Sequence, residues 1–136
     1  MAYWLMKSEP ASYSWDDLVR DGGTEWDGVR NNPARLHLRA MKAGDEAFFY
    51  HSMSDKAVVG IMRIVREGQP DPKDADWTSV RVEPIRPIEP VTLAEIKAEP
   101  SLAQMELIRQ SRLSVAPVRE EEWKTVLRLS DSKADR

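Results

Sequence analysis

Short apolar runs separated by polar, glycine-rich or proline-rich breaks recur along this chain of 136 residues. The run AYWLMKS at residues 2–8 is apolar enough for a buried strand. EAFFYHS at 46–52 and AVVGIMRIV at 57–65 are joined only by a polar turn. This short connection predicts an antiparallel pair of strands.

A further strand is predicted after a proline-rich and aspartate-rich loop at 66–76. The segment WTSVRVEPIRPI at 77–88 alternates apolar and polar residues, as a half-buried strand does. Pro84, Pro87 and Pro90 cannot donate hydrogen bonds to a neighbouring strand. We therefore expect this segment to run along a sheet edge or a barrel rim.

Capping signals mark the starts of three helices. They are Ser14 with Asp17, Asn32 with Pro33 at the first helical position, and Thr92 with Glu95. The helix after Asn32 is predicted to end near Met41. The segments SLAQMELI at 101–108 and EEEWKTVLRL at 120–129 predict two more helices, the last with an apolar face.

The order of these elements defines the fold class. Strands and helices do not alternate as they do in a parallel doubly wound sheet. The chain also has the length of one ordinary domain. We predict a single α+β domain over residues 1–130, a small curved mixed or antiparallel sheet or pseudo-barrel with short peripheral helices, and a disordered tail at 131–136.

Composition narrows the class of protein. With 41% hydrophobic and 32% charged residues, the chain is typical of a globular protein, and its apolar runs are too short for a membrane helix. No secretory signal precedes the first strand, so we expect a cytoplasmic protein without membrane contact. Because the chain has no cysteine and only two histidines, we expect no metal and no cofactor.

Charge is distributed unevenly. The net charge of −3 argues against non-specific coating of nucleic acid. Residues 28–44 nevertheless contain no acid and carry the four cations Arg30, Arg35, Arg39 and Lys42. Three of them, Arg35, Arg39 and Lys42, fall on one stripe of the predicted helix. That stripe is either ordinary solvated surface or a face that follows phosphates.

The stretch EWDGVRNNPAR at 25–35 is the strongest candidate site. Trp26 lies between two acids and next to Gly28, which makes it either a packing anchor or a binding platform, whereas Trp4, Trp15, Trp77 and Trp123 are expected in or near the core. Asn31 and Asn32 exceed what one helix cap needs, and an amide edge matches a nucleobase.

No enzyme motif accompanies this stretch. His51 and Ser52 are neighbours, but neighbouring side chains on a strand point to opposite faces and cannot act as base and nucleophile. The patterns GxSxG, HExxH, GxGxxG and the P-loop are absent. We therefore expect a binding protein and not an enzyme.

Several motifs together resemble the EVE domain family. They are WLMKSEP at 4–10, WDGVRN at 26–31, ARLHLRAMKAGDEAFFYHS at 34–52 and RLSVAPV at 112–118. The resemblance implies a PUA-like fold and a non-enzymatic reader of modified bases, chiefly modified cytosine in DNA. The loop at 66–76 is short where many relatives carry an insertion.

The resemblance also implies a base pocket in which Trp26 stacks on a flipped base. The implied pocket residues are Ser8, Trp26, Gly28, Val29, Asn31, His51, Ser52, Leu113 and Ser114, and the phosphates would contact Arg30, Arg35, Arg39 and Lys42. Two alternatives remain at this point: an RNA-binding PUA-like module without modification sensing, and a module that binds a small molecule.

Overall fold

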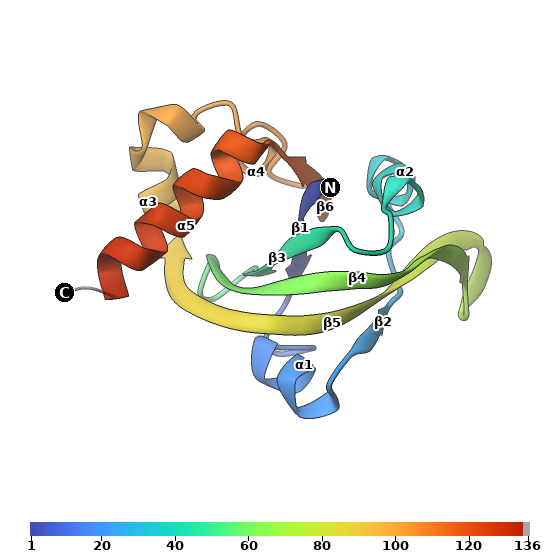
Figure 1. Ribbon diagram of the computed structural model, residues 1–136. Helices are drawn as coiled ribbons and strands as arrows, with labels where there is room; N and C mark the ends of the chain where they lie inside the picture. The colour runs from blue at the N-terminus through green and yellow to red at the C-terminus, as the bar shows by residue number, and fades with distance from the viewer. Residues whose placement is uncertain (135–136) are drawn as a thin grey trace.

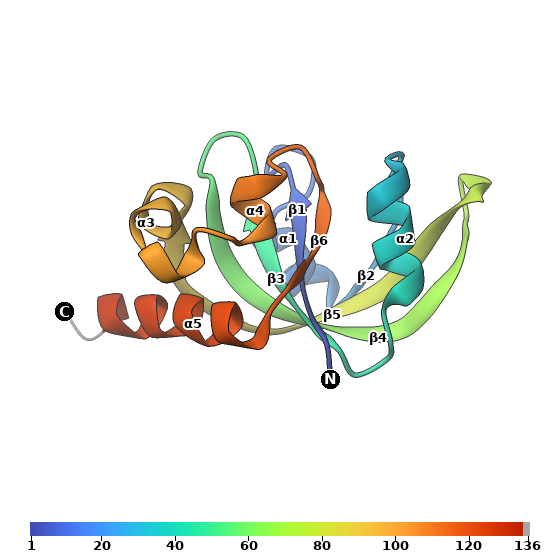
Figure 2. The same cartoon turned by 90° about the horizontal axis from the view of Figure 1, so that it is seen from above.

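The computed structural model describes residues 1–134, which form a curved sheet with helices around it (Figures 1 and 2). The strands are β1 (Tyr3–Ser8), β2 (Thr24–Trp26), β3 (Glu46–His51), β4 (Ala57–Asp71), β5 (Asp74–Thr92) and β6 (Val115–Val118). Their order in the sheet is β2-β5-β4-β3-β1-β6. β1 and β3 are parallel and all other pairs are antiparallel. The predicted α+β fold with a curved mixed sheet is confirmed.

The hairpin of β4 and β5 is longer than predicted. We expected the first strand to end near residue 65 and a loop to fill 66–76, but β4 continues to Asp71 and β5 begins at Asp74. Several bulges interrupt the register of this pair, which allows the polar residues to stay in the ladder. Periodicity in the sequence fails here because the only buried residue between 66 and 76 is the polar Asp71, so no apolar face alternates with a polar one.

Pro84 and Pro87 of β5 have a neighbouring strand on one side only, in agreement with the predicted edge position. β2 pairs only with residues 80–82 of β5. Pro84 and Pro87, which pair with β4 on the other side, lie beyond the end of β2. A missing N–H is tolerated there because no strand needs it.

The helices are α1 (Trp15–Asp21), α2 (Asn32–Ala40), α3 (Leu93–Ala98), α4 (Glu106–Arg109) and α5 (Glu120–Ala134). α1 and α3 begin with the predicted capping boxes. The cap predicted at Asn32 is wrong: Oδ1 of Asn31 accepts from N of Ala34 at 3.0 Å, so the helix begins one residue earlier. Pro33 still lies in the first turn, where its missing N–H costs nothing.

Two predictions about the C-terminal third are also wrong. Residues 101–108 do not form one helix, because a short 3₁₀ turn (Pro100–Leu102) and α4 are separated by an irregular stretch. The predicted disordered tail begins inside α5, which continues to Ala134. Ser130 Oγ donates to O of Glu89 on β5 at 2.8 Å, and Lys133 Nζ lies 2.9 Å from Glu95 of the following helix, so both elements hold this last turn. Residues 135–136 lie outside the described residues.

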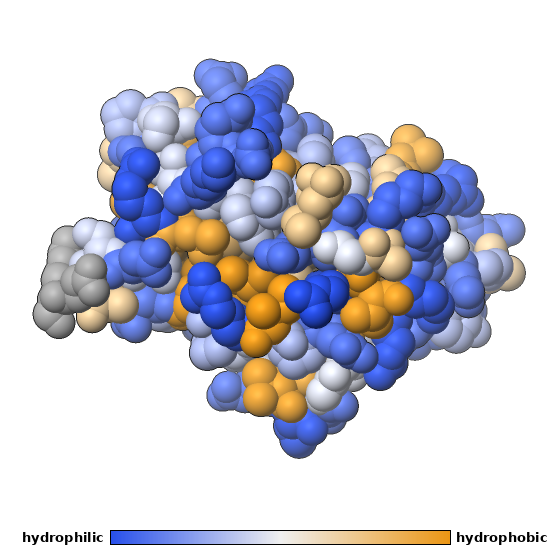
Figure 3. Space-filling view, viewed as in Figure 1, coloured by the Kyte–Doolittle hydropathy of each residue, from blue (hydrophilic) through white to orange (hydrophobic). Residues whose placement is uncertain are grey.

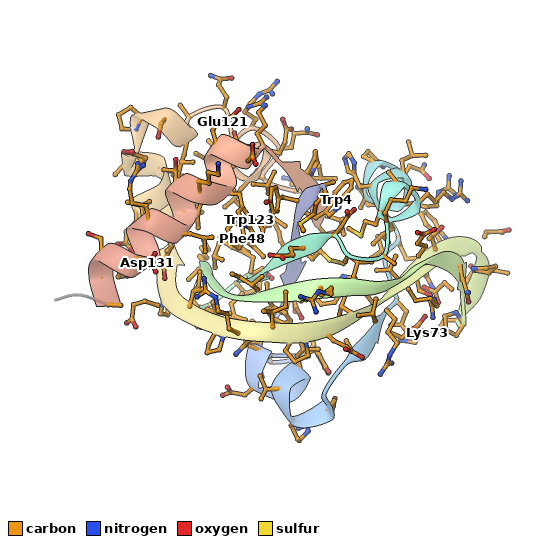
Figure 4. All side chains as sticks on the ribbon, in the orientation of Figure 1. Trp4, Phe48, Lys73, Glu121, Trp123 and Asp131 are labelled. Atoms are coloured by element: carbon orange, nitrogen blue, oxygen red, sulfur yellow. The ribbon has the colours of Figure 1, made fainter. Side chains whose placement is uncertain are left out.

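Two apolar cores lie on opposite sides of the sheet. We call them the cavity-side core, which contains Phe49, Trp15 and Trp26, and the α5-side core, which contains Phe48 and Trp123. Phe48 and Phe49 are neighbours on β3, so their side chains point to opposite faces. Figure 4 shows Phe48 and Trp123 together beneath α5. The tryptophans predicted in the core, Trp4, Trp15 and Trp123, are buried, and Trp77 is half-buried.

The surface reflects this arrangement. Apolar residues gather in a broken band across the middle of the face in Figure 3, over the curved strands, and most of the surface around this band is hydrophilic. Within residues 1–134, no helix is both long and apolar enough to cross a membrane.

Candidate nucleic-acid interface

The largest cavity described, of about 570 Å³, opens between the end of β1, the exit of β2 and the tip of the β4–β5 hairpin. We call it the main cavity. Its lining residues are Lys7, Ser8, Glu9, Ser12, Tyr13, Thr24, Glu25, Trp26, Asp27, Gly28, Val29, Arg30, Lys73 and Ser114. A volume in this range is usual for sites that bind small molecules or single nucleotides.

The wall at residues 27–30 is held by a buried carboxylate on the hairpin. Oδ2 of Asp71 accepts from N of Gly28 at 2.8 Å and from Nη1 of Arg30 at 3.0 Å, and Oδ1 accepts from N of Lys73 at 2.7 Å. Burial acts to raise the pKa of Asp71, but these hydrogen bonds and the Arg30 charge together lower it. Gly28 has a φ of 77°, which favours glycine, so the chain can turn sharply here.

Trp26 is both a packing residue and a cavity residue. Its side chain is only 8% exposed and meets Phe49 edge to face at 5.6 Å between ring centroids. It nevertheless lines the main cavity. Trp26 is therefore a packing anchor, and because the same ring forms part of the cavity wall, its role as a binding platform stays a prediction.

The structure brings together only part of the predicted pocket. Ser8, Trp26, Gly28, Val29, Ser114 and the predicted phosphate ligand Arg30 all line the main cavity. Asn31 and Leu113 instead line a second, neighbouring cavity. Neither cavity is lined by His51 or Ser52.

His51 and Ser52 have structural partners. Nε2 of His51 accepts from N of Trp15 at 3.0 Å, and Nδ1 lies 3.0 Å from Oδ2 of Asp55. The N–H of Ser52 donates to O of Ser8 at 2.9 Å. Both ring nitrogens of His51 are therefore engaged in fixing α1 and the turn after β3.

Two of the four predicted phosphate ligands, Arg35 and Arg39 on α2, direct their side chains onto the β4–β5 hairpin. Arg35 donates to O of Asp76 at 3.0 Å and its guanidinium lies 5.0 Å from the Trp77 ring centre. Nε of Arg39 donates to Oγ1 of Thr78 at 3.1 Å. The stripe is thus not simply solvated surface, because two of its arginines join α2 to β5. Lys42 remains exposed beyond the end of α2.

Several cavity residues were not predicted. Lys7, Glu9 and Asp27 lie within or next to the motifs that were singled out, so the sequence offered a signal for them. Lys73 had no such signal, since it reaches the cavity only through the hairpin tip (Figure 4). Its Nζ lies 3.4 Å from Oδ1 of Asp27, across the mouth of the site.

The charges of the main cavity are mixed. The pKa of Glu25 is lowered chiefly by its hydrogen bond with Arg66. The pKa of Lys7 is lowered by burial. Among residues 1–134, no group of three or more His, Cys, Asp or Glu side chains is placed to hold a metal ion.

Comparison with known proteins places this geometry in a family. The EVE domain matches residues 2–129. Human thymocyte nuclear protein 1 is 36% identical over 97% of this chain and 75% of its own length. That alignment extends over 169 positions against 136 residues here, so the human protein has insertions relative to this chain.

Solved structures similar to this chain agree with the family match. A Rhodopseudomonas palustris protein is 51% identical with a TM-score of 0.92 over 97% of this chain and 94% of that one. Human thymocyte nuclear protein 1 in complex with DNA containing 5-methylcytosine is 35% identical with a TM-score of 0.90, over 96% and 98%. An ASCH protein from Zymomonas mobilis, 12% identical with a TM-score of 0.58, shares the fold alone. On these matches, the chain belongs to the EVE domain family.

Proposed function

We propose that this protein is a non-enzymatic reader of modified cytosine in DNA, which accepts a flipped base in the main cavity. The observation that carries the proposal is a single-nucleotide-sized cavity with an aromatic wall. It is supported by a structural relative that binds DNA containing 5-methylcytosine.

The cavity lining offers partners for the amino group, the ring and the methyl group of a modified cytosine. The base carries an amino group on C4, and a carboxylate can accept a hydrogen bond from it. Asp27 is half-buried, and its one partner among the described side chains, Lys73, is 3.4 Å away. Trp26 and Val29 supply apolar surface for the ring and its methyl group.

The energies fit this mode of binding. Stacking a base on an aromatic side chain contributes about 1 to 3 kcal/mol, which is comparable with the few kcal/mol that flipping a base costs. One additional methyl group in an apolar pocket contributes about 1 to 3 kcal/mol, or roughly 10-fold to 200-fold in affinity. Discrimination should therefore come from the methyl contact together with the polar edge.

The test is a titration of two oligonucleotides that differ in one 5-methyl group on one cytosine. We expect tighter binding of the methylated strand by about tenfold or more. Asp27→Ala should weaken binding of both strands by about fivefold, since one hydrogen bond of about 1 kcal/mol is lost. Asp16→Ala on α1 is the matched control, because Asp16 is exposed and lines neither cavity.

Other outcomes would replace the proposal. Equal binding of both strands would point to a nucleic-acid module without modification sensing, and preference for RNA would point to an RNA-binding one. Binding of nucleosides without any binding of oligonucleotides would point to a small-molecule module. Trp26→Ala is a poor test, because truncating a buried tryptophan costs about 3 to 5 kcal/mol of folding stability.

A further inference from the structure

A second cavity, of about 340 Å³, adjoins the main cavity. Its lining residues are Asn31, Pro33, Gln110, Ser111, Arg112 and Leu113. The two cavities share two stretches of chain. Residues 28–30 line the first cavity, and Asn31 and Pro33 line the second. Ser114 lines the first and residues 110–113 line the second.

The turn at 110–114 between the cavities is firmly held. N of Leu113 donates to O of Gln110 at 2.9 Å. Lys7 binds the turn twice, because its N donates to O of Ser114 at 2.9 Å and its Nζ donates to O of Ser111 at 2.8 Å. A turn fixed in this way is a preorganised binding surface.

The charge of the second cavity differs from that of the main cavity. No acidic residue lines it. Arg112 is exposed and forms no ion pair or hydrogen bond with any residue in 1–134, and Lys7 has no carboxylate partner in that range. By contrast, Arg30 is paired with Asp71 and Arg109 with Glu106. Two cations without a counter-ion therefore flank the boundary between the cavities.

The remaining groups suit a base. Asn31 uses Oδ1 to cap α2, so its amide N–H groups have no partner within the described chain. Gln110 donates through Nε2 to Glu106, which leaves its carbonyl oxygen as an acceptor. Pro33 and Leu113 add apolar surface. Amide donors and acceptors with apolar surface can hold a nucleobase without strict sequence preference.

We infer that the second cavity binds the nucleotide next to the flipped one, with Arg112 and Lys7 on the phosphate that joins the two. This inference rests on the proposed function and specifies the path of the strand. Residues lining the two cavities follow one another along the chain, at Arg30 and Asn31 and again at Leu113 and Ser114, so the cavities adjoin as neighbouring nucleotides do. Cavities lined by sequence neighbours can thus hold neighbouring nucleotides.

The experiment compares ligands with and without the joining phosphate. The probes are the nucleoside 5-methyl-2′-deoxycytidine and a single-stranded oligonucleotide that carries one 5-methylcytosine. Arg112→Gln should weaken oligonucleotide binding about fivefold at low salt and leave nucleoside binding unchanged. The slope of log K against log salt should fall by about 0.7, the value for one phosphate contact on a single strand.

Two controls make the result specific. Arg112→Lys should keep most of the oligonucleotide affinity, because it keeps the charge. Arg86→Gln removes a charge from an exposed arginine on β5 that lines neither cavity, and should leave the slope unchanged. Since exposed Arg112 forms no hydrogen bond or ion pair with any residue in 1–134, its replacement should not alter folding.

The outcomes separate this inference from the function on which it rests. Preference of the unmodified protein for the methylated strand reports on the main cavity alone. If that preference is present but Arg112→Gln binds the oligonucleotide with unchanged affinity and slope, the second cavity does not hold the strand. The inference would also be overturned if Arg112→Gln weakened binding of the nucleoside and the oligonucleotide equally. The same holds if Arg86→Gln lost as much oligonucleotide affinity as Arg112→Gln.

Discussion

The two sides of the sheet bury aromatic residues in different ways. On the α5 side, the Trp123 ring stacks on Phe48 at 3.9 Å and on Tyr3 at 4.4 Å, and α5 covers the stack. On the cavity side, the rings of Trp26 and Trp15 meet Phe49 edge to face, each at 5.6 Å. Trp26 at the edge of this second core also borders the main cavity.

This difference shows which aromatic core is covered by a long helix and which one borders the main cavity. On the α5 side, a helix of 15 residues packs on the core, and its stacked aromatic rings contribute to stability. The cavity side is covered by two shorter helices, α1 and α2, and by a hairpin tip that Asp71 ties down. A site held by a few polar contacts over a rigid core can open to a ligand without loss of the fold.

Trp123→Ala should have the largest effect on this contrast. Truncation of a buried tryptophan costs about 3 to 5 kcal/mol of unfolding free energy, and the stack with Phe48 and Tyr3 would be lost. Urea denaturation measures the loss. Leu36→Ala on α2 is the control, because Leu36 is 58% exposed and should change stability by about 0.5 kcal/mol or less.

Ligand affinity of Trp123→Ala, measured well below its melting temperature, should match that of the unchanged protein. A large loss of affinity in the fully folded variant would contradict the separation of the two sides.

Asp71→Asn should have an intermediate effect, confined to the cavity side. Loss of the charged acceptor for Gly28, Lys73 and Arg30 costs about 1 to 3 kcal/mol, and the wall at residues 27–30 should loosen and weaken ligand binding. Urea denaturation and oligonucleotide titration measure the two effects. Asp76→Asn is the control, since the Asp76 carboxylate has no hydrogen-bond partner among the described residues.

The contribution of Asp71 to stability should also appear when the pH is lowered. The pKa of Asp71 is lowered in the fold, so its stabilisation is present above the unfolded value of about 3.9 and is lost as pH falls through the lower folded value. Asp71→Asn should therefore show a shallower loss of stability with acid than the unchanged protein. Identical acid profiles would exclude this role.

Arg35→Gln should have the smallest effect. It removes the contact with the Trp77 ring and the hydrogen bond to Asp76, at a cost of about 0.5 to 1 kcal/mol. Urea denaturation with Lys42→Gln as control measures it, because exposed Lys42 lies beyond the hairpin contacts. If both variants behave alike, the arginine stripe of α2 does not hold the hairpin.

Sequence and structure agree best where the stabilising contacts are local. The capping boxes of α1 and α3 each join residues three positions apart, and both were predicted correctly. The cap of α2 was misplaced by one residue, since two adjacent asparagines give the same signal. Membership of the EVE family followed from motifs spread along the chain and was confirmed by the match to residues 2–129.

The sequence by itself thus determined the fold class, the family, the candidate stretch at 25–35 and six of the fourteen residues that line the main cavity. Only the tertiary structure decided that Asp71 holds Gly28 from 43 residues away, that Lys73 reaches the cavity, and that His51 belongs to the scaffold. The physical reason is the separation along the chain of the residues that interact. Caps and alternation act between near neighbours, whereas the cavity arises where segments distant in sequence satisfy each other's buried polar groups.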